Sequence, residues 1–406
     1  MLGIVLMGLK GRAAVTGIAE YKNVRKYTGK RKFFLEQWAE LTQLALADAG
    51  LSKHDVDGLC CAAIPESAMF APATIAEYLG LQVNFAETVD LGGASSVSMI
   101  WRAAAAIEMG ICEAVVCAAP GLPIPSNPNP PVKDPARVYG STSAKWGSPQ
   151  AEYDVPYGNV AQNAGYALIA QRYAATYGYD ERALAKIAVD QRTNAQGNPN
   201  AVFYGEPISI DDVLQSKMIA DPLHILEIVM PCAGGSAVVV VSERLAKKCK
   251  HRPVYVTGFG ERLTTRSVTY AKDMTISPVG PAASSAFAMS GKKPRDVDVL
   301  EAYDCYTITV LLTIEDSGFC EKGEGTTFVN ENDLTFSGSF PVNTHGGQLG
   351  AGQAAGVAGG MSQPVEGVRQ IMGRADGRQV ANCNAALITG TGGIMSEQSA
   401  IILEGA

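Results

Sequence analysis

Carboxyl, phenol and thiol side chains crowd into six consecutive residues of the second half of the chain. Residues 301–306 read E-A-Y-D-C-Y and follow a short apolar segment that predicts a strand. From Thr307 the apolar residues recur at helical spacing, and Gly318 supplies a stop. Polar and ionisable groups at the point where a strand passes into a helix are typical of α/β enzyme sites. The stretch therefore predicts an active site, and the alternative is a core strand whose tyrosines only pack.

Three glycine-rich segments are the other candidate parts of a binding site. Residues 90–110 read D-L-G-G-A-S-S before an Ala-rich helix, so backbone N–H groups could face a ligand, or the helix could pack closely on its twin. Residues 343–361 contain seven Gly, which argues against an ordinary helix start and favours close backbone approach. Residues 386–403 predict two strands around a glycine-rich turn. His345 is the only His in these loops, and a structural role for it is as open as a catalytic one.

The elements around these segments predict one α/β unit that is present twice. An apolar strand is expected at residues 13–18 and again at residues 254–260. In each half, a helical stretch is followed by D-V-D and a second apolar strand, within residues 51–59 and 291–300. The shared order of elements predicts a duplicated α/β fold, with two central mixed sheets and buried helices between them.

The predicted halves are residues 13–250 and 251–406, and the first carries an insertion at about residues 121–215. Six Pro within residues 121–140 exclude a regular core element, which leaves a surface loop or a cover over the active site. Two helices are predicted between residues 159 and 197. We expect the insertion to lie on top of the first unit and to shape a pocket or a dimer surface.

Composition excludes several classes of partner and site. The 406 residues carry a formal net charge of −7, so a general surface for nucleic acid is not expected. Nine scattered Cys without a C-x-x-C pair, together with only four His, argue against a metal site. The apolar N-terminus is short and has no basic residues before it, so it predicts neither a signal peptide nor a membrane span. The simplest expectation is a cytoplasmic protein with reduced cysteines.

Taken together, five segments of the chain resemble the thiolase superfamily, in its sterol-carrier or lipid-transfer type, over nearly the whole length. They are D-L-G-G-A-S-S, I-A-D-P-L-H-I-L, E-A-Y-D-C-Y-T, N-T-H-G-G-Q-L-G-A-G-Q and T-G-T-G-G. The resemblance implies a five-layer αβαβα thiolase fold, a homodimer and a coenzyme A thioester as substrate, with no permanently bound cofactor. The residues that it implies for binding the substrate or CoA are Gly93, Ser95, Gly346, Gly347, Gln353 and Gly392.

The chain departs from the thiolase pattern at each reactive position. Gly93 stands where the resemblance implies a nucleophilic Cys, and Tyr303 stands where it implies Asn or His. Gln353 replaces the His of a G-H-P motif, and Ile388 falls at the place of a second Cys. Because an acyl-enzyme needs a thiolate nucleophile and glycine has no side chain, that intermediate is not expected at the usual position.

Three functions remain open after these departures. In a retro-aldol cleavage of a 3-hydroxyacyl-CoA, Tyr303 would act as base or proton shuttle and His345 would stabilise the enolate. This resembles thiolase-like aldolases that shorten sterol side chains and that work in a heterotetramer with a small OB-fold, zinc-ribbon protein. An atypical thiolase with Cys305 as a displaced nucleophile is the second, and it would cleave a 3-ketoacyl-CoA. The third is a non-catalytic acyl-CoA or lipid binder, which would have no reason to keep the cluster at residues 301–306.

The roles expected for the remaining groups follow from their chemistry. A phenol ionises near a pKa of about 10, so Tyr303 needs help as a base, and His345 is the expected helper. Asp304 is expected to orient its loop or to cap the helix that follows. We expect the pantetheine of CoA to enter between the insertion and the glycine-rich loops and to end near Gly93 and His345. The strand at residues 115–118 is apolar on both faces, which predicts its burial between the subunits of the homodimer.

Overall fold

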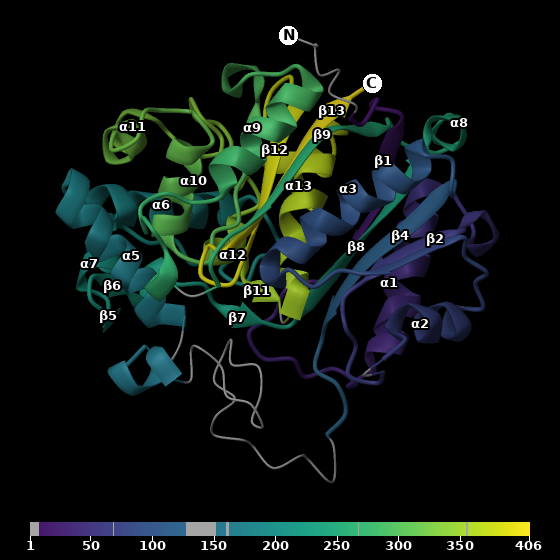
Figure 1. The fold of residues 1–406 in the computed structure, drawn as a ribbon, viewed down its shortest axis with the longest axis horizontal. Helices are drawn as coiled ribbons and strands as arrows, with labels where there is room; N and C mark the ends of the chain where they lie inside the picture. Colours follow the sequence, from purple (N-terminus) through teal and green to yellow (C-terminus); the bar gives the residue numbers. More distant parts are fainter. Residues whose placement is uncertain (1–7, 68, 127–151, 160–161, 267, 355) are drawn as a thin grey trace.

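A mixed sheet of nine strands runs through the protein in the computed structural model, which describes residues 8–67, 69–126, 152–159, 162–266, 268–354 and 356–406 (Figure 1). The order across the sheet is β10-β12-β13-β9-β1-β8-β4-β2-β3. Its strands are β1 (Ala13–Glu20), β2 (Gly58–Cys61), β3 (Phe85–Thr88), β4 (Ala114–Gly121), β8 (Gly234–Ser242), β9 (Val254–Leu263), β10 (Val299–Glu301), β12 (Ala385–Gly392) and β13 (Glu397–Gly405). Two short pairs, β5 (Met218–Ala220) with β6 (Leu223–His224) and β7 (Pro231–Cys232) with β11 (Gln353–Ala354), lie outside it.

The strand pairing is the same in both halves. In the first half β1 pairs antiparallel with β8, β8 antiparallel with β4, and β4 parallel with β2. In the second half β9 pairs antiparallel with β13, β13 antiparallel with β12, and β12 parallel with β10. The two half-sheets meet where Ala14 and Val15 of β1 pair with Tyr255 and Val254 of β9. The prediction of two separate sheets is therefore wrong, because the pairing of β1 with β9 joins the two half-sheets into one continuous sheet.

The repeated D-V-D motif has the same structural role in each half. The side chain of Asp57 accepts hydrogen bonds from the backbone N–H groups of Glu113 and Ala114, at 2.8 and 2.9 Å, where β4 begins. The side chain of Asp298 accepts from Asn384 and Ala385, also at 2.8 and 2.9 Å, where β12 begins. The second Asp of each motif thus ties two parallel strands together at their starts, which explains the repeat physically.

Helices cover both faces of each half-sheet, so that the fold has five layers. On the outer face of the first half-sheet lie α1 (Phe34–Ala49) and α2 (Ala71–Leu79), and on that of the second lie α9 (Val279–Ser290) and α10 (Thr307–Asp316). Between the half-sheets lie α3 (Ser95–Glu108) and α13 (Ser362–Ile371). The five-layer αβαβα fold and the helices predicted before Gly50 and after Tyr306 are confirmed.

Successive side chains of β4 point to opposite faces of the sheet, and both faces are covered by helices, which explains why the strand is apolar throughout. In β4, Val115 and Cys117 belong to the central core with α3, while Val116 and Ala118 belong to the outer core with α1. A strand that lies between two helical layers needs apolar residues on both faces. The strand also hydrogen-bonds on both sides, to β2 and to β8. The prediction that residues 115–118 lie between subunits is therefore wrong, because β4 is an inner strand of one chain.

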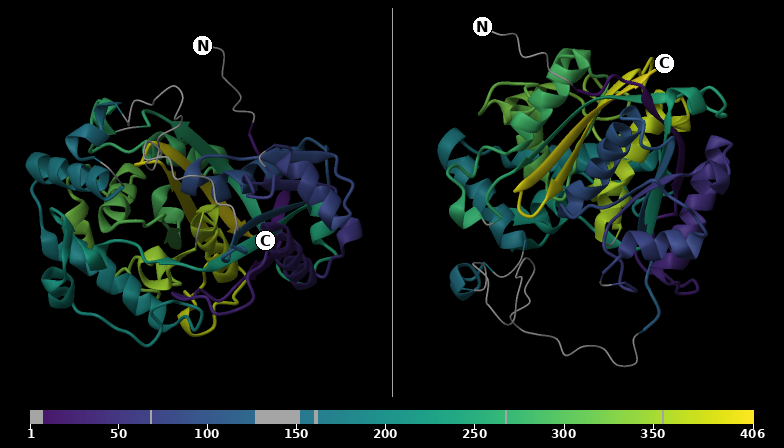
Figure 2. Two further views of the ribbon diagram at one scale, coloured as in Figure 1. Left: turned by 90° about the horizontal axis from the view of Figure 1, so that it is seen from below. Right: turned by 45° about the vertical axis from the view of Figure 1, so that its right-hand side comes forward.

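The insertion packs on the second half of the chain. Its helices α5 (Gln162–Tyr177) and α6 (Glu181–Gln196) contact α10, α11 (Gly325–Glu331) and α12 (Gly347–Ala351), and both views of Figure 2 place them together. The expectation that it lies on the first unit is wrong, because the buried faces of α5 and α6 join the core around α10. Of the Pro-rich segment, residues 127–140 lie outside the described part. Two short α-helices of the described residues are α7 (Ile210–Gln215) and α8 (Glu243–Ala246).

Among the described helices, none is both long enough and apolar enough to cross a bilayer.

Candidate active site

Tyr303 lies at the meeting point of four elements from both halves of the chain. It follows β10, and its ring approaches Gly93 in the 3-10 turn Gly92–Ala94 that precedes α3. A Cβ atom on Gly93 would lie 2.3 Å from the phenol oxygen of Tyr303 and 2.4 Å from the backbone oxygen of Thr391 in β12. The fourth element, the 3-10 segment Gly356–Gly360, approaches so closely that a Cβ on Gly360 would lie 2.1 Å from the Gly93 carbonyl oxygen. The phenol therefore occupies the space that any side chain at position 93 would need.

The side-chain amide of Gln353 donates a hydrogen bond to the phenol of Tyr303. Its Nε2 donates to the hydroxyl oxygen of Tyr303 at 3.0 Å and to Oε1 of Gln348 at 2.7 Å. The backbone N–H of Tyr303 donates to Oγ1 of Thr389 at 3.3 Å. A donor aimed at a phenol oxygen stabilises the phenolate relative to the phenol. Since only 6% of Tyr303 is exposed, this contact is screened little by water.

Asp304 fixes the start of the short helix α12. Its buried carboxylate accepts from the backbone N–H groups of Gln348 at 2.9 Å and Leu349 at 3.0 Å, and from Nε2 of Gln363 at 3.1 Å. Burial raises the pKa of Asp304 to about 6, although the two backbone donors oppose this. The carboxylate thus orients the loop that carries Gln348, and it caps α12 rather than the helix that follows it in sequence.

The glycines of this loop allow the close approach. Gly346 and Gly347 have φ values of 105° and 57°, and a Cβ on Gly347 would lie 2.2 Å from Oδ2 of Asp304. A helix nevertheless begins at Gly347, so the argument against an ordinary helix start at residues 343–361 is only partly right. The positive φ values and the close approach account for the glycines.

Cys305 is buried at the junction between β10 and α10. The residue is 5% exposed, and burial raises the pKa of its thiol to about 12. Tyr166 of α5 lies beside it and stacks on Tyr306 with ring centroids 4.1 Å apart. A thiol in this setting stays protonated at neutral pH, which does not favour a nucleophilic role.

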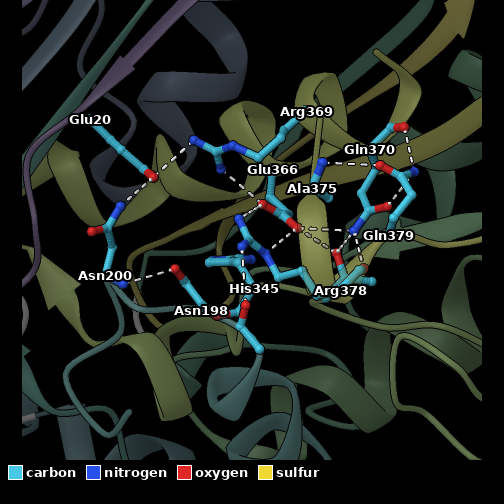
Figure 3. Close-up of polar contacts among 12 residues, drawn as sticks. Glu20, Asn198, Asn200, His345, Glu366, Arg369, Gln370, Ala375, Arg378 and Gln379 are labelled. Atoms are coloured by element: carbon cyan, nitrogen blue, oxygen red, sulfur yellow. Dashed lines mark hydrogen bonds and ion pairs between the residues drawn. The ribbon is translucent and has the colours of Figure 1, made fainter. Parts of the chain in front are cut away.

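His345 lies in a buried network of charges (Figure 3). Its Nδ1 is 3.2 Å from Oε2 of Glu301, an ion-pair distance without hydrogen-bond geometry, and its carbonyl accepts from Asn198. Burial lowers the pKa of His345, but the contact with Glu301 and the negative charges of Glu301, Glu366 and Asp304 together outweigh burial and hold this pKa above its usual value. Thr344 bridges the network by donating to Glu301 and contacting Glu366, both at 2.9 Å. His345 is thus part of the charge network around Glu301 and Glu366, whereas the residue of this loop region that contacts Tyr303 is Gln353.

Glu366 is the central anion of this network. Arg378 donates to it through Nε and Nη2, each at 2.9 Å, and Arg369 donates at 2.9 Å while also reaching Glu20 of β1. Burial raises the pKa of Glu366, but the charges of Arg378 and Arg369 outweigh this and hold it well below its usual range. The network therefore ties α13 to the first half of the chain as well as to the loop of His345 (Figure 3).

The other predicted positions divide between the site and its support. Gly392 packs against the turn that carries Gly93, since a Cβ on Gly392 would be 2.0 Å from the carbonyl oxygen of Leu91 and a Cβ on Gly92 would be 3.2 Å from Cα of Gly392. Ser95 uses its hydroxyl locally, because Oγ accepts from the N–H of Leu91 at 2.8 Å. Ile388 packs on Gly367 of α13, and the polar neighbour of Tyr303 on β12 is Thr389.

Two residues of the site, Gln348 and Thr389, were not singled out from the sequence. Gln348 lies within the segment N-T-H-G-G-Q-L-G-A-G-Q, five residues before Gln353. A second amide so near Gln353 in a glycine-rich segment was the feature from which its contact with Gln353 could have been predicted. Within the described residues no group of three or more His, Cys, Asp or Glu side chains could hold a metal ion.

Comparisons with known proteins agree over nearly the whole chain. The family model "Thiolase C-terminal domain-like" matches residues 260–405. A 17-hydroxy-3-oxo-4-pregnene-20-carboxyl-CoA lyase of Mycobacterium tuberculosis is 32% identical over 404 residues, covering 95% of this chain and 97% of that protein. A steroid side-chain-cleaving aldolase of Thermomonospora curvata is 31% identical, covering 95% and 96%. The solved structure of an Ltp2-ChsH2(DUF35) aldolase matches with a TM-score of 0.84 at 30% identity and covers 98% of both chains.

Proposed function

We propose that this chain, which belongs to the thiolase superfamily, is an acyl-CoA lyase that cleaves the C2–C3 bond of a 3-hydroxyacyl-CoA by retro-aldol chemistry. The observation that carries the proposal is the position of the Tyr303 hydroxyl, which fills the space beside Gly93. A side chain at position 93 would collide with the Tyr303 phenol and with the carbonyl oxygen of Thr391, so both would have to shift to admit a nucleophile there. A site with a proton-transfer group and no nucleophile suits a reaction without an acyl-enzyme.

Tyr303 carries the proton in this mechanism. As phenolate it takes the proton of the C3 hydroxyl, C3 becomes a carbonyl carbon, and the electrons of the C2–C3 bond form the enolate of the CoA thioester. Tyr303 then returns the proton to C2, so the enzyme ends unchanged and the products are a ketone or aldehyde and a shorter acyl-CoA. Gln353 stabilises the phenolate through its hydrogen bond, and Gln348 holds the Gln353 amide in place.

The substrate class follows from the relatives and their names. Two of them are named for cleavage of steroid side chains or of a pregnene carboxyl-CoA. We therefore assign a CoA thioester with a large apolar acyl group as substrate, and no permanently bound cofactor. A small OB-fold, zinc-ribbon protein is the proposed partner, supported by the pairing of Ltp2 with ChsH2(DUF35) in the related structure.

The test is a product assay with and without that partner. Incubation with a steroid 3-hydroxyacyl-CoA is expected to release a carbonyl compound and a shorter acyl-CoA without added free CoA. Activity only on a 3-ketoacyl-CoA plus free CoA would identify a thiolase instead. Binding of both thioesters without any turnover, with the partner present, would identify a non-catalytic binder.

The burial of Cys305 makes a sharp prediction about its role. Cys305→Ala is expected to keep kcat for the lyase reaction within about threefold, because a protonated thiol takes no part in the proposed steps. The measurement is steady-state kinetics with the 3-hydroxyacyl-CoA. A variant that binds the substrate normally but has lost all turnover would restore Cys305 as the nucleophile of an atypical thiolase.

The proposed homodimer needs a surface other than β4. Among the described strands β3 is an edge of the sheet beside β2, and both Ala86 and Thr88 on it are exposed. An unpaired strand edge is a template for pairing with a second copy. Light scattering at micromolar concentration is expected to give twice the mass of the chain. Thr88→Lys should shift the mass towards that of one chain, whereas Glu77→Lys on exposed α2 should not; a monomeric wild type would contradict the dimer.

A further inference from the structure

A cavity of about 540 Å³ lies outside the site of Tyr303. Its walls come from α5, the start of α9, the segment that links β9 to α9, and the turn between β12 and β13. Ile169, Met274, Ile394 and Met395 are among the apolar side chains that form most of its lining. Sites that enclose ligands of drug size have volumes of about 300–1,000 Å³ and are mostly apolar. The cavity is therefore large enough for a ring system.

The cavity and the candidate active site share a wall. Ile394 and Met395 follow Gly392 and Gly393 in the same turn, and Gly92 is packed against those two glycines. On the insertion side, Tyr166 lies one helical turn before Ile169, donates to the carbonyl of Gly393 at 3.3 Å and stacks on Tyr306. A substrate whose reactive carbons lie at Tyr303 would thus need to extend only past this turn to reach the cavity.

The charges around the cavity favour an apolar occupant. The charged residues in its lining are two cations, Arg262 and Lys272, and one anion, Asp273. The several phosphate charges of a nucleotide would require more cations than this. At the mouth, Ile276 is 57% exposed and Tyr270 is 49% exposed. Apolar side chains that line a cavity and face water gain free energy when an apolar ligand covers them.

We propose that this cavity binds the ring-bearing, apolar end of the acyl group, so that it selects large acyl-CoA substrates over short ones. The inference rests on the proposed function for the identity of the ligand, because the reacting carbons must lie at Tyr303 while the rest of the acyl group passes the turn at Gly392–Met395. The cavity therefore determines specificity, and the reacting carbons do not enter it.

A charge at the mouth tests the proposal. Ile276→Asp is expected to weaken binding of a steroid acyl-CoA about tenfold, because the carboxylate would be desolvated by the apolar ligand. The probe is a steroid acyl-CoA that lacks the 3-hydroxyl, and its affinity is measured by calorimetry without any turnover. Ile276→Leu should bind it normally, and Met109→Asp, on a residue that is 76% exposed at the end of α3, is the control for added charge. Affinity for 3-hydroxybutyryl-CoA should be unchanged in all three variants.

The possible outcomes separate the cavity from the reaction. Equal weakening of the steroid and short thioesters by Ile276→Asp would place CoA in the cavity and overturn the proposal. Unchanged affinity for both would overturn it as well, and a simultaneous change in oligomeric mass would point to a second copy as the occupant. A wild type that binds the steroid probe but cleaves no 3-hydroxyacyl-CoA disproves the retro-aldol reaction, while selective weakening by Ile276→Asp still supports the cavity.

Discussion

Tyr303→Phe is expected to lower kcat by about 10²–10⁴-fold with little change in the affinity for the acyl-CoA. The substitution keeps the ring that packs against Gly93 and Gly360 and removes only the hydroxyl oxygen. It also removes the acceptor of the Gln353 hydrogen bond, so both the proton carrier and its stabilising contact are lost. The measurement is steady-state kinetics with a 3-hydroxyacyl-CoA, with affinity measured separately on the analogue that lacks the 3-hydroxyl.

The matched control for this prediction is Tyr306→Phe. Tyr306 lies at the same junction, and its hydroxyl donates to Asn163 at 2.6 Å on the side of the insertion. Loss of that hydrogen bond is expected to cost stability of about 1 kcal/mol and to lower kcat far less than Tyr303→Phe does. A Tyr303→Phe enzyme with full activity would remove the mechanism, and equal losses in both variants would indicate that each simply disturbs the packing.

Glu366→Gln is expected to lower the free energy of unfolding by about 3–5 kcal/mol. The substitution leaves Arg369 and Arg378 buried without their shared anion, and Arg378 loses a bidentate contact. Gln is nearly isosteric with Glu, so the loss reports the missing charge rather than a cavity. Urea unfolding followed by circular dichroism at pH 7 measures the difference.

Two comparisons make the result specific. Glu206→Gln removes a partner of Arg25 from an ion pair whose side chains are 55% and 45% exposed, and this should cost less than about 1 kcal/mol. Because the pKa of Glu366 is lowered in the folded protein, its contribution is fully present above the unfolded pKa of about 4.3 and is lost as the pH falls below it. The difference between wild type and Glu366→Gln should therefore shrink at low pH, and a gap that stays constant would contradict the charged state of Glu366.

Local patterns in the sequence were enough to predict many of the helices and strands and part of the candidate active site. The helical spacing after Thr307 predicted α10. The repeated Asp-Val-Asp predicted the duplication, and it did so correctly because Asp57 and Asp298 make equivalent hydrogen bonds in the two halves. Tyr303 and Asp304 were predicted as site residues because ionisable groups at the junction of a strand and a helix are typical of α/β enzyme sites. In each case the signal lies within a few residues, where periodicity and residue type determine the structure directly.

The sequence predictions were wrong or incomplete where the structure depends on contacts between segments that are far apart in the chain. An apolar strand such as β4 is compatible with a subunit interface and with an inner strand, and only its hydrogen bonds to β2 and β8 decide. The buried face of α6 predicts a partner layer but does not say that the layer is α10. The Glu301 contact of His345 and the Gln353 contact of Tyr303 join residues more than forty positions apart, which one sequence does not show.

The close approach of Gly93 to Tyr303 also has a consequence for how such a sequence can change over time. A cysteine placed at position 93 would bring its Cβ to 2.3 Å from the phenol oxygen and 2.4 Å from the carbonyl oxygen of Thr391, so both groups would have to shift to admit it. Loss of Tyr303 before the cysteine arrives would leave neither a proton carrier nor a nucleophile. The two positions therefore constrain each other, and neither change alone is expected to produce a site for acyl-enzyme chemistry. Lineages that carry this pair are expected to keep glycine and tyrosine together or to lose them together.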